Sequence, residues 1–331
     1  MKYEIFTMAT VLAATKATSL AESPADSMKM MWDAFKEEHQ RHYSTEEEEY
    51  RRFGIFKDAL RSIDLRNAAE RSAGGSAVHG ITQFSDMTQE EFESLLKYEP
   101  SKEYLRSSST DVEVPPYEGT QSSVDWTGKY TTPVKDQGYC GSCWAFAATE
   151  QIESDAMRTL KKTYVLSPQQ MVSCDNKDGG CNGGRQETAY NYVKDTGGQE
   201  QEKDYPYSST EGKTGSCKVD KSKFVMGVQS YSTVKGESSM SNYVKSTGPL
   251  SIVVDASDWN SYKGGIKSSC GNHINHAVQA VGVDTGNGGY WKVRNSWGSR
   301  WGESGFIRLE YGKNMCALAS QGATYVHPTK V

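Results

Sequence analysis

The seven cysteines of this 331-residue chain all lie between positions 140 and 316, and the first 139 residues contain none. An odd number of cysteines in an oxidising compartment predicts disulfide pairs and one free thiol. Cys140 and Cys143 stand two residues apart in the stretch QGYCGSCWAF. Thiol redox pairs, metal clips and certain nucleophiles share this spacing, so the spacing alone leaves the role of the two sulfurs open.

The N-terminus has the pattern of a secretory signal peptide over residues 1–21. Lys2 precedes an apolar stretch over residues 5–14, and Ser19-Leu20-Ala21 is a small-residue cleavage site. An ordinary amphipathic helix is the alternative, because Lys16 and several threonines dilute the apolar stretch. No later run approaches the roughly 20 apolar residues that a membrane span needs. We therefore expect no membrane attachment and entry through the secretory pathway, with a secreted or a lysosomal/vacuolar destination.

Composition excludes some classes of partner. The formal net charge is only -5, and no block of Lys and Arg is interleaved with aromatic residues, so we expect no nucleic-acid partner. With 36% hydrophobic residues the chain can bury a sizeable core in one large or two smaller domains. A monomer is the default expectation.

Residues 22–100 have the pattern of a helical region. Thr45 precedes four consecutive glutamates, which are favourable in a first helical turn, and Thr88 with Glu91 forms a capping box that predicts a second helix over residues 87–98. Polar residues with a serine cluster and two prolines follow over residues 99–123, which is typical of a linker exposed to proteolysis. The apolar residues that recur at spacings of three and four are Trp32, Phe35, Phe53, Phe56, Leu60 and Ile63.

The region after residue 124 changes character and contains every cysteine. The pattern predicts a helix that begins near Cys143 and runs through Ala148, Ile152 and Ala156. The stretches PLSIVVDA, HAVQAVGV and GYWKVRNSW are short, β-branched or aromatic, and bounded by turn residues, which predicts strands. A helical part followed by a strand-rich part indicates an α+β fold with two subdomains.

A nucleophilic thiol needs a base, and the base needs a third group that orients its ring. His276 begins the apolar run HAVQAVGV, so a strand could hold its ring rigidly, whereas His273 and His327 lie in polar surroundings typical of solvated histidines. Taken alone, a histidine such as His276 more often has a structural role than a catalytic one. The other three histidines, which lie in the N-terminal helical region, are His39, His42 and His79.

Three motifs together resemble the papain family of cysteine proteases: QGYCGSCWAF, NHAVQAVG and VRNSWGSRWG. The resemblance implies a papain-like fold with Cys143 as nucleophile, His276 as acid and base, and Asn295 as the residue that orients the imidazole. It also implies that Gln137 donates to the oxyanion beside the backbone N–H of Cys143, and that Trp297 covers the hydrogen bond between Asn295 and His276. No metal and no organic cofactor is implied.

The expected position of Cys143 at a helix N-terminus favours its thiolate. A papain-type cysteine has a pKa roughly five units below that of a free thiol, which corresponds to about 7 kcal/mol. The helix dipole supplies only about 1 kcal/mol, so a protonated His276 has to supply most of the stabilisation. We therefore expect a thiolate–imidazolium pair.

The family pattern also pairs the remaining cysteines and assigns the N-terminal region to an inhibitory propeptide. Ala59 and Thr82 depart from the propeptide motifs, because each stands where an Asn is usual. The implied pairs are Cys140 with Cys181, Cys174 with Cys217, and Cys270 with Cys316. The propeptide positions that match cathepsin L-like members are Glu48, Arg52, Phe56, Ile63, Asn67, Gly80, Phe84 and Asp86.

The resemblance implies an inactive precursor of an endopeptidase, with a signal peptide over residues 1–21, a propeptide over 22–114 and a peptidase domain over 115–331. No long insertion of the kind that blocks the cleft in dipeptidase-type relatives precedes the motif CNGG. Protein and peptide substrates, and the propeptide as an intramolecular inhibitor, are the expected partners. We also hypothesise activation by acid, because the propeptide is rich in carboxylates and carries Asp86 in its second motif.

Three sets of residues are implied to bind substrate. Asn182, Gly183 and Gly184 would face the substrate backbone, with the glycines permitting close approach. Arg185 and Gln186 occupy a wall that is more often apolar, so the pocket could tolerate acidic groups, although Arg185 turned into solvent is the stronger alternative. The residues implied to line the pocket for the second residue before the scissile bond, which is expected to accept Leu or Val, are Val253, Ile274 and Gln321.

Two other functions compete with this interpretation. A thioredoxin-like oxidoreductase would use Cys140 and Cys143 as a reducible pair, but it would not need His276 and would leave Asn295 unexplained. A non-enzymatic binding or inhibitory homologue would keep the fold without the activity, although all four implied catalytic residues are present.

Overall fold

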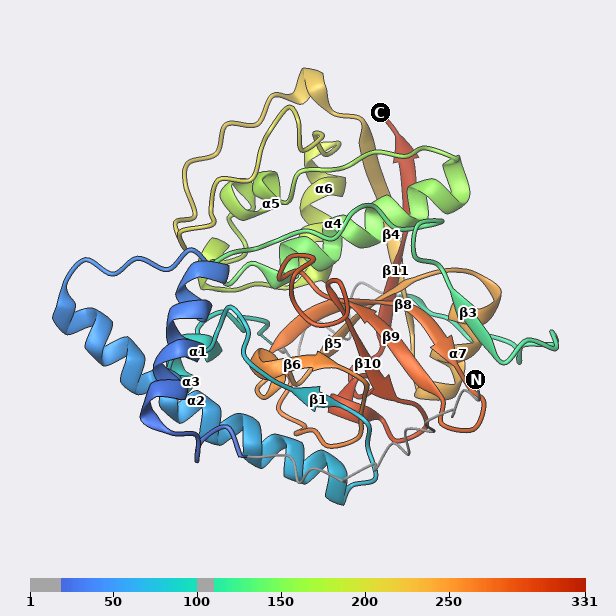
Figure 1. The fold of residues 1–331 in the computed structure, drawn as a ribbon. Coiled ribbons are helices and arrows are strands. Elements are labelled where there is room, and N and C mark those ends of the chain that lie inside the picture. The colour runs from blue at the N-terminus through green and yellow to red at the C-terminus, as the bar shows by residue number, and fades with distance from the viewer. Residues whose placement is uncertain (1–18, 100–109) are drawn as a thin grey trace, which may run out of the picture.

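The computed structural model describes residues 19–99 and 110–331. Most of the predicted signal peptide therefore lies outside the described residues. Figure 1 shows three parts: N-terminal helices on one side, a second group of helices, and a strand-rich part that both groups contact. This arrangement confirms the predicted α+β architecture. In the described part of the chain, no helix is both long and apolar enough to cross a membrane.

The helices are α1 (Ala25–Glu38), α2 (Glu46–Ser72), α3 (Gln89–Glu93), α4 (Cys143–Asp155), α5 (Pro168–Cys174), α6 (Gln186–Thr196) and α7 (Glu237–Ser246). The strands are β1 (Val78–His79), β2 (Thr110–Asp111), β3 (Ser123–Asp125), β4 (Met226–Val234), β5 (Leu250–Val254), β6 (Tyr262–Gly264), β7 (Ile266–Lys267), β8 (His276–Asp284), β9 (Tyr290–Arg294), β10 (Phe306–Glu310) and β11 (Ala323–Lys330).

Helix α4 is the central element of the helical subdomain. All of its residues are buried, and it contacts α5 and α6 on one side and β8 and β11 on the other. Its alanines let neighbouring elements approach closely, while Trp144 and Ile152 fill the core between α4 and α6. The predicted helix is therefore confirmed through Ile152, and Ala156 begins a π-helical turn, Ala156–Leu160.

The strand-rich subdomain is built on a sheet with the order β2-β4-β11-β5-β8-β9-β10-β7, and β3 pairs with β8. Strand β8 pairs antiparallel with both β5 and β9, and all three predicted strand stretches are confirmed. The first residue of β8, His276, is buried and pairs with Val254 of β5. The end of β9 at Arg294 brings Asn295 to the same edge of the sheet.

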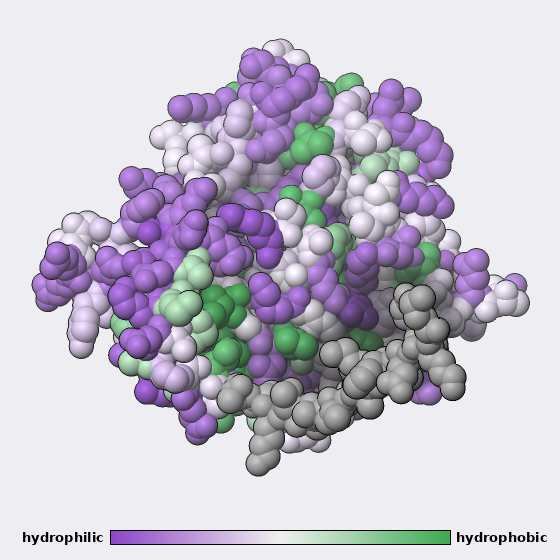
Figure 2. Space-filling model, viewed as in Figure 1, coloured by the Kyte–Doolittle hydropathy of each residue, from purple (hydrophilic) through white to green (hydrophobic). Residues whose placement is uncertain are grey.

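The N-terminal segment, defined here as residues 19–99, has a small aromatic core of its own. Trp32 stacks on Phe35 and Tyr43, with ring centroids 5.4 and 5.6 Å apart, and the predicted apolar residues of α2 pack beneath them. Thr45 caps α2 by accepting a hydrogen bond from the backbone N–H of Glu48, as predicted. Exposed large hydrophobic side chains are scattered singly over this segment, and Figure 2 shows mostly hydrophilic side chains on its face.

Helix α3 is shorter than the sequence predicts. The capping box of Thr88 and Glu91 is present, but the helix ends at Glu93 instead of continuing to residue 98. Leu95, Leu96 and Tyr98 are buried, because the chain leaves the helix and runs across the C-terminal domain, defined here as residues 110–331. Burial of these side chains against another part of the protein overrides the local helical pattern.

Candidate active site

Cys143 is the first residue of α4 and is completely buried. Its thiol therefore lies at the positive end of the helix dipole, and the backbone N–H groups of Ala277 and Lys97 also point at the sulfur. Ser142 precedes it as the N-cap, although its hydroxyl bonds the hydroxyl of Tyr207 at 2.9 Å instead of capping the helix. Cys143 is the one cysteine outside a disulfide.

The three implied disulfides are confirmed. Cys140 bonds Cys181, Cys174 bonds Cys217, and Cys270 bonds Cys316. The first bond ties the turn before Cys143 to the loop that carries Asn182, and the backbone N–H of Gly141 donates to the carbonyl of Cys181 at 3.0 Å. Of the two neighbouring sulfurs in the CGSC motif, one is therefore structural and one is free for chemistry.

His276 and Asn295 form a buried hydrogen bond. The Nε2 atom of His276 lies 2.8 Å from the Oδ1 atom of Asn295, which also accepts from the backbone N–H of Ser296 at 2.8 Å. This arrangement fixes the proton on Nε2 and leaves Nδ1 of His276 with no hydrogen-bond partner among the described residues. Ala277, the next residue, contacts Cys143, so the free ring nitrogen belongs to the same corner of the site.

Trp297 covers this pair. Its ring stacks on the imidazole of His276 with centroids 4.9 Å apart and planes inclined by 29°. Phe84 and Phe92 of the N-terminal segment pack edge-on against Trp297 at 5.2 and 5.4 Å. Trp297 therefore lies over the imidazole as the resemblance implies, and its outer side is covered by the N-terminal segment.

The side-chain amide of Gln137 is buried and held at both of its polar atoms. Its side chain is held by Ser296, whose hydroxyl donates to Oε1 at 2.6 Å, and its Nε2 donates to the carbonyl of Cys140 at 2.9 Å. The same Nε2 donates to the carbonyl of Leu95 at 3.3 Å. A carbonyl of the N-terminal segment thus occupies the donor that a substrate carbonyl would need.

The N-terminal segment crosses the site as an extended chain. Gly184 donates its backbone N–H to the carbonyl of Lys97 at 3.1 Å, and Tyr98 donates its own to the carbonyl of Asn275 at 3.0 Å. Gly183 has a φ of +122°, and a Cβ there would lie 2.6 Å from the carbonyl oxygen of Lys97. Close approach of another backbone therefore requires glycine at this position, as the sequence predicts.

The implied pocket residues lie around Tyr98. Val253 and Ile274 pack against its ring, and Gln321 accepts a hydrogen bond from its hydroxyl. Asn182 is exposed at the rim. Arg185 corrects the prediction, because it does not turn into solvent: it is 7% exposed, and its Nε lies 3.5 Å from a carboxylate oxygen of Glu187.

The comparisons with known proteins agree with this geometry. Residues 120–326, more than half of the chain, match the family described as papain family cysteine protease. Residues 32–92 match the cathepsin propeptide inhibitor domain. This chain belongs to the papain family of cysteine proteases. The match to the inhibitor domain, together with the occupied cleft, means that the protease is made as an inactive precursor.

Relatives and solved structures cover nearly the whole protease. It is 41% identical over 298 residues to a cathepsin L-like proteinase of Phaedon cochleariae, covering 86% of this chain and 89% of the relative. A digestive procathepsin L 3 of the Tenebrio molitor larval midgut has a TM-score of 0.79 and 33% identity, covering 90% of this chain and 98% of that one. A recombinant stem bromelain precursor has a TM-score of 0.76 and 32% identity, covering 91% and 99%.

The charge state of the site corrects the prediction of a thiolate–imidazolium pair. Burial raises the pKa of Cys143 to about 11, although nearby N–H groups oppose this, and burial lowers the pKa of His276 to about 4, although Asn295 opposes this. Both groups are therefore neutral in the precursor at physiological pH. The prediction did not include the burial of both groups by the protease's own N-terminal segment.

Several functional residues of the precursor were missed at the sequence level. Leu95, Lys97 and Tyr98 block the cleft, and the sequence places them in a predicted helix. Tyr207 supports the turn before Cys143, because its hydroxyl donates to the carbonyl of Gln137 at 2.9 Å. The stretch YPY around Tyr207 carries no motif, so its role follows only from the contact.

Proposed function

We propose that Cys143 is the nucleophile of a cysteine endopeptidase, that His276 is its acid and base, and that Asn295 orients the imidazole. The observation that carries this assignment is the single free thiol at a helix N-terminus beside the buried pair of His276 and Asn295. We assign Gln137, together with the backbone N–H of Cys143, to the stabilisation of the oxyanion.

The proposed reaction begins once the N-terminal segment has left the cleft. Water and the neighbouring imidazole then favour transfer of the thiol proton to Nδ1 of His276. The thiolate attacks the peptide carbonyl carbon, and the developing oxyanion accepts hydrogen bonds from Nε2 of Gln137 and the N–H of Cys143. His276 gives its proton to the leaving amine, and a water molecule, deprotonated by His276, hydrolyses the thioester.

The processing scheme stays a proposal as well. Residues 1–21 would be removed as a signal peptide, residues 22–114 as the propeptide, and residues 115–331 would form the mature enzyme. We expect passage through the secretory pathway to a secreted or lysosomal/vacuolar destination, a monomer, and neither nucleic-acid nor membrane partners. Protein and peptide substrates would enter the cleft that residues 95–98 occupy in the precursor.

Alkylation of the thiol tests the proposed nucleophile. At neutral pH we expect iodoacetamide to modify Cys143 at least roughly a thousandfold more slowly in the precursor than in the acid-processed enzyme, because burial raises the pKa of the precursor thiol to about 11. Peptide mapping by mass should find one label, on Cys143, at complete loss of peptide-amide hydrolysis. Activity that survives full modification of Cys143, or a label that accumulates equally fast in both forms, would refute the assignment.

Two kinds of titratable group, carboxyl groups and a histidine, would contribute to activation by acid, and they titrate in different pH ranges. Hydrogen bonds from Arg51 and Arg52 lower the pKa of Glu48 to about 2. All three side chains lie on α2, so this shift stabilises the fold of the N-terminal segment itself above the ordinary pKa of 4.5, and the stabilisation is lost only as the pH falls from there toward 2. Protonation of such carboxyl groups therefore weakens the N-terminal segment only in strongly acidic solution.

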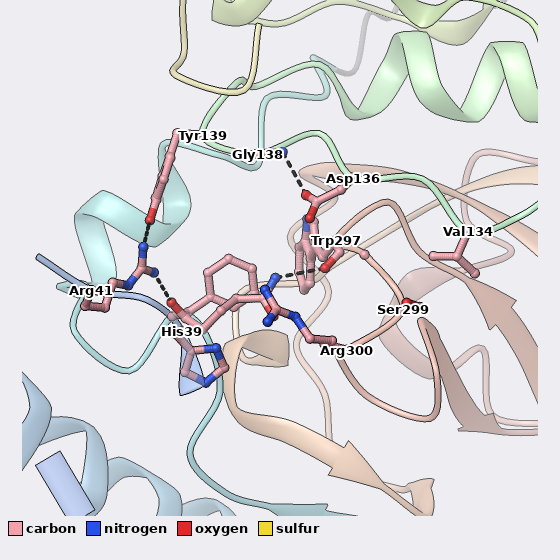
Figure 3. A pocket seen from close by; sticks show the side chains of 12 residues that line it. His39, Arg41, Val134, Asp136, Gly138, Tyr139, Trp297, Ser299 and Arg300 are labelled. Carbon is pink, nitrogen blue, oxygen red and sulfur yellow. Dashed lines mark hydrogen bonds between the residues drawn. The ribbon is translucent and has the colours of Figure 1, made fainter. Parts of the chain in front are cut away.

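His39 acts at a higher pH. Its side chain is 6% exposed, and it lines a cavity of about 410 Å³ between the N-terminal segment and the C-terminal domain (Figure 3). Burial lowers its pKa from the ordinary 6.5; Arg41, Arg300 and Lys263 lower it further, and the carboxylate of Glu38, 3.9 Å away, opposes them. Below pH 6.5 the released segment takes up a proton that the docked segment does not, so docking weakens as the pH falls.

Replacing His39 by glutamine is accordingly expected to move the onset of self-processing to lower pH. The change removes a group whose protonation favours release, and neither ring nitrogen has a hydrogen-bond partner among the described residues, so none is lost. The measurement is chain mass against time from pH 7 to pH 4 at one protein concentration. His273→Gln, which alters an exposed histidine, is the matched control; equal profiles for the two variants would exclude a role for His39.

A further inference from the structure

A tyrosine of the N-terminal segment fills the pocket beside the thiol. Tyr98 is 4% exposed. Its backbone N–H donates to the carbonyl of Asn275, the residue before His276. On the opposite wall, the backbone N–H of Gly184 donates to the carbonyl of Lys97, the residue before Tyr98. The side chain is therefore presented to the pocket by the same two walls that flank Cys143. The residues packed around it are Cys143, Ala147, Val253, Ala277 and, partly buried, Ile274.

The far end of the pocket is polar. The hydroxyl of Tyr98 donates to Oε1 of Gln321 at 3.2 Å. Burial raises the pKa of Tyr98, so the phenol keeps its proton and remains a donor. Gly322, which follows Gln321, has a φ of +82°, and a Cβ there would lie 2.8 Å from the side chain of Thr233. The turn that presents Gln321 therefore requires glycine.

The charged groups near the phenol cancel one another. Arg185 and Glu187 are 7% and 6% exposed and lie 3.5 Å apart, and both act electrostatically on the hydroxyl of Tyr98. A pocket that contains a closed ion pair offers no net charge to an acidic or a basic substrate side chain. Apolar walls and one amide at the end remain as the features that distinguish side chains.

From this pocket we infer that Gln321 makes the protease selective for tyrosine at the second residue before the scissile bond. The inference rests on the proposed function. Leucine or valine would leave the end of the pocket unfilled, and phenylalanine would fill it but leave the amide without its partner. Tyrosine satisfies both the apolar walls and the amide.

The test compares peptide amides that carry Tyr, Phe or Leu at that residue and are otherwise identical. For the acid-processed enzyme, kcat/KM should be roughly three- to tenfold higher for Tyr than for Phe, which is the effect of one neutral hydrogen bond. Gln321→Leu should bring the ratio of kcat/KM for the Tyr amide to kcat/KM for the Phe amide to one or below. Gln321→Glu keeps a hydrogen-bond acceptor and should retain a preference for the Tyr amide. A ratio that Gln321→Leu leaves unchanged, or a wild-type enzyme that prefers Phe or Leu, overturns the inference.

A second measurement on the full chain needs no turnover. Tyr98→Phe should raise the rate at which iodoacetamide labels Cys143 of the precursor by roughly three- to tenfold, because the docked segment loses one hydrogen bond. The same substitution should have no further effect in a Gln321→Leu precursor, and an undiminished effect there would overturn the inference. Absence of hydrolysis for all three amides would instead refute the proposed function, and the labelling result would still decide what Gln321 recognises.

Discussion

Replacing Cys143 by alanine is expected to reduce peptide-amide hydrolysis by roughly 10⁵-fold or more, as removal of a nucleophile does in other covalent proteases. The substitution removes the one free thiol and leaves the bond between His276 and Asn295 intact, so the fold should survive. On acidification the variant should keep its full chain mass while the unmutated precursor is shortened. Both quantities can be followed in one series of samples by mass spectrometry and by amide hydrolysis.

The control for this variant separates chemistry from folding. A trace of processed wild-type enzyme, added to the Cys143→Ala precursor at acid pH, should release a fragment of the same mass as wild-type self-processing yields. Hydrolysis within tenfold of wild type would place the nucleophile elsewhere. A redox role for Cys140 and Cys143 is already disfavoured, because Cys140 is bonded to Cys181.

The sequence was sufficient for the elements that carry Cys143 and His276 because its signals are local and separated. The helix that begins near Cys143 and the strand that begins at His276 follow from periodicity and turn residues, whereas Asn295 was placed inside a predicted strand that ends one residue earlier, at Arg294. Cysteine pairing and the roles proposed for Cys143, His276, Asn295 and Gln137 could not be derived in this way. They came from the family resemblance, and the structure confirms the pairing and places Gln137 beside Cys140.

The predictions that failed depend on contacts between distant parts of the chain. Residues 87–98 have a capping box and helical residues, yet the helix ends at Glu93 because Leu95 and Tyr98 gain more by burial in the cleft. For Arg185, the stronger alternative from the sequence was a side chain turned into solvent. It is instead the extended residue before α6, with φ −140° and ψ 139°, and from there it reaches Glu187.

The second large effect is expected at a buried ion pair that joins the N-terminal segment to the C-terminal domain. Glu70 of α2 and Lys267 of β7 are each 1% exposed and lie 3.1 Å apart. Burial alone would raise the pKa of Glu70, but the nearby ring of His79, 4.0 Å away, the hydrogen bond from the backbone N–H of Ser268 and the charge of Lys267 lower it to about 2. The carboxylate therefore stays ionised and depends on its partners.

Substituting Glu70 with methionine leaves Lys267 buried with only Asp258, at 2.7 Å, as a carboxylate partner. Breaking a buried pair typically costs about 3–5 kcal/mol. Because Lys267 keeps Asp258, we expect the lower end of this range, so the open population of the precursor should rise by roughly 10²-fold. The readout is the rate at which iodoacetamide labels Cys143 of the intact precursor at neutral pH. This rate tracks the open population when closing is faster than labelling.

Two further variants decide whether the buried pair itself is responsible. Asp58→Ala removes a partner of Arg61 in a surface pair whose side chains are more than half exposed, and it should change the labelling rate less than about fivefold. Glu70→Met combined with Lys267→Met replaces both charges by apolar groups of similar volume. It should label more slowly than Glu70→Met alone, because no buried lysine is then left without Glu70, and Asp258, whose side chain is 29% exposed, keeps access to water. If the double variant labelled at least as fast as Glu70→Met alone, the buried ion pair would not be what keeps the precursor closed. The closed state of the precursor would then depend on the packing of Phe84 and Phe92 over Trp297 instead of on this ion pair.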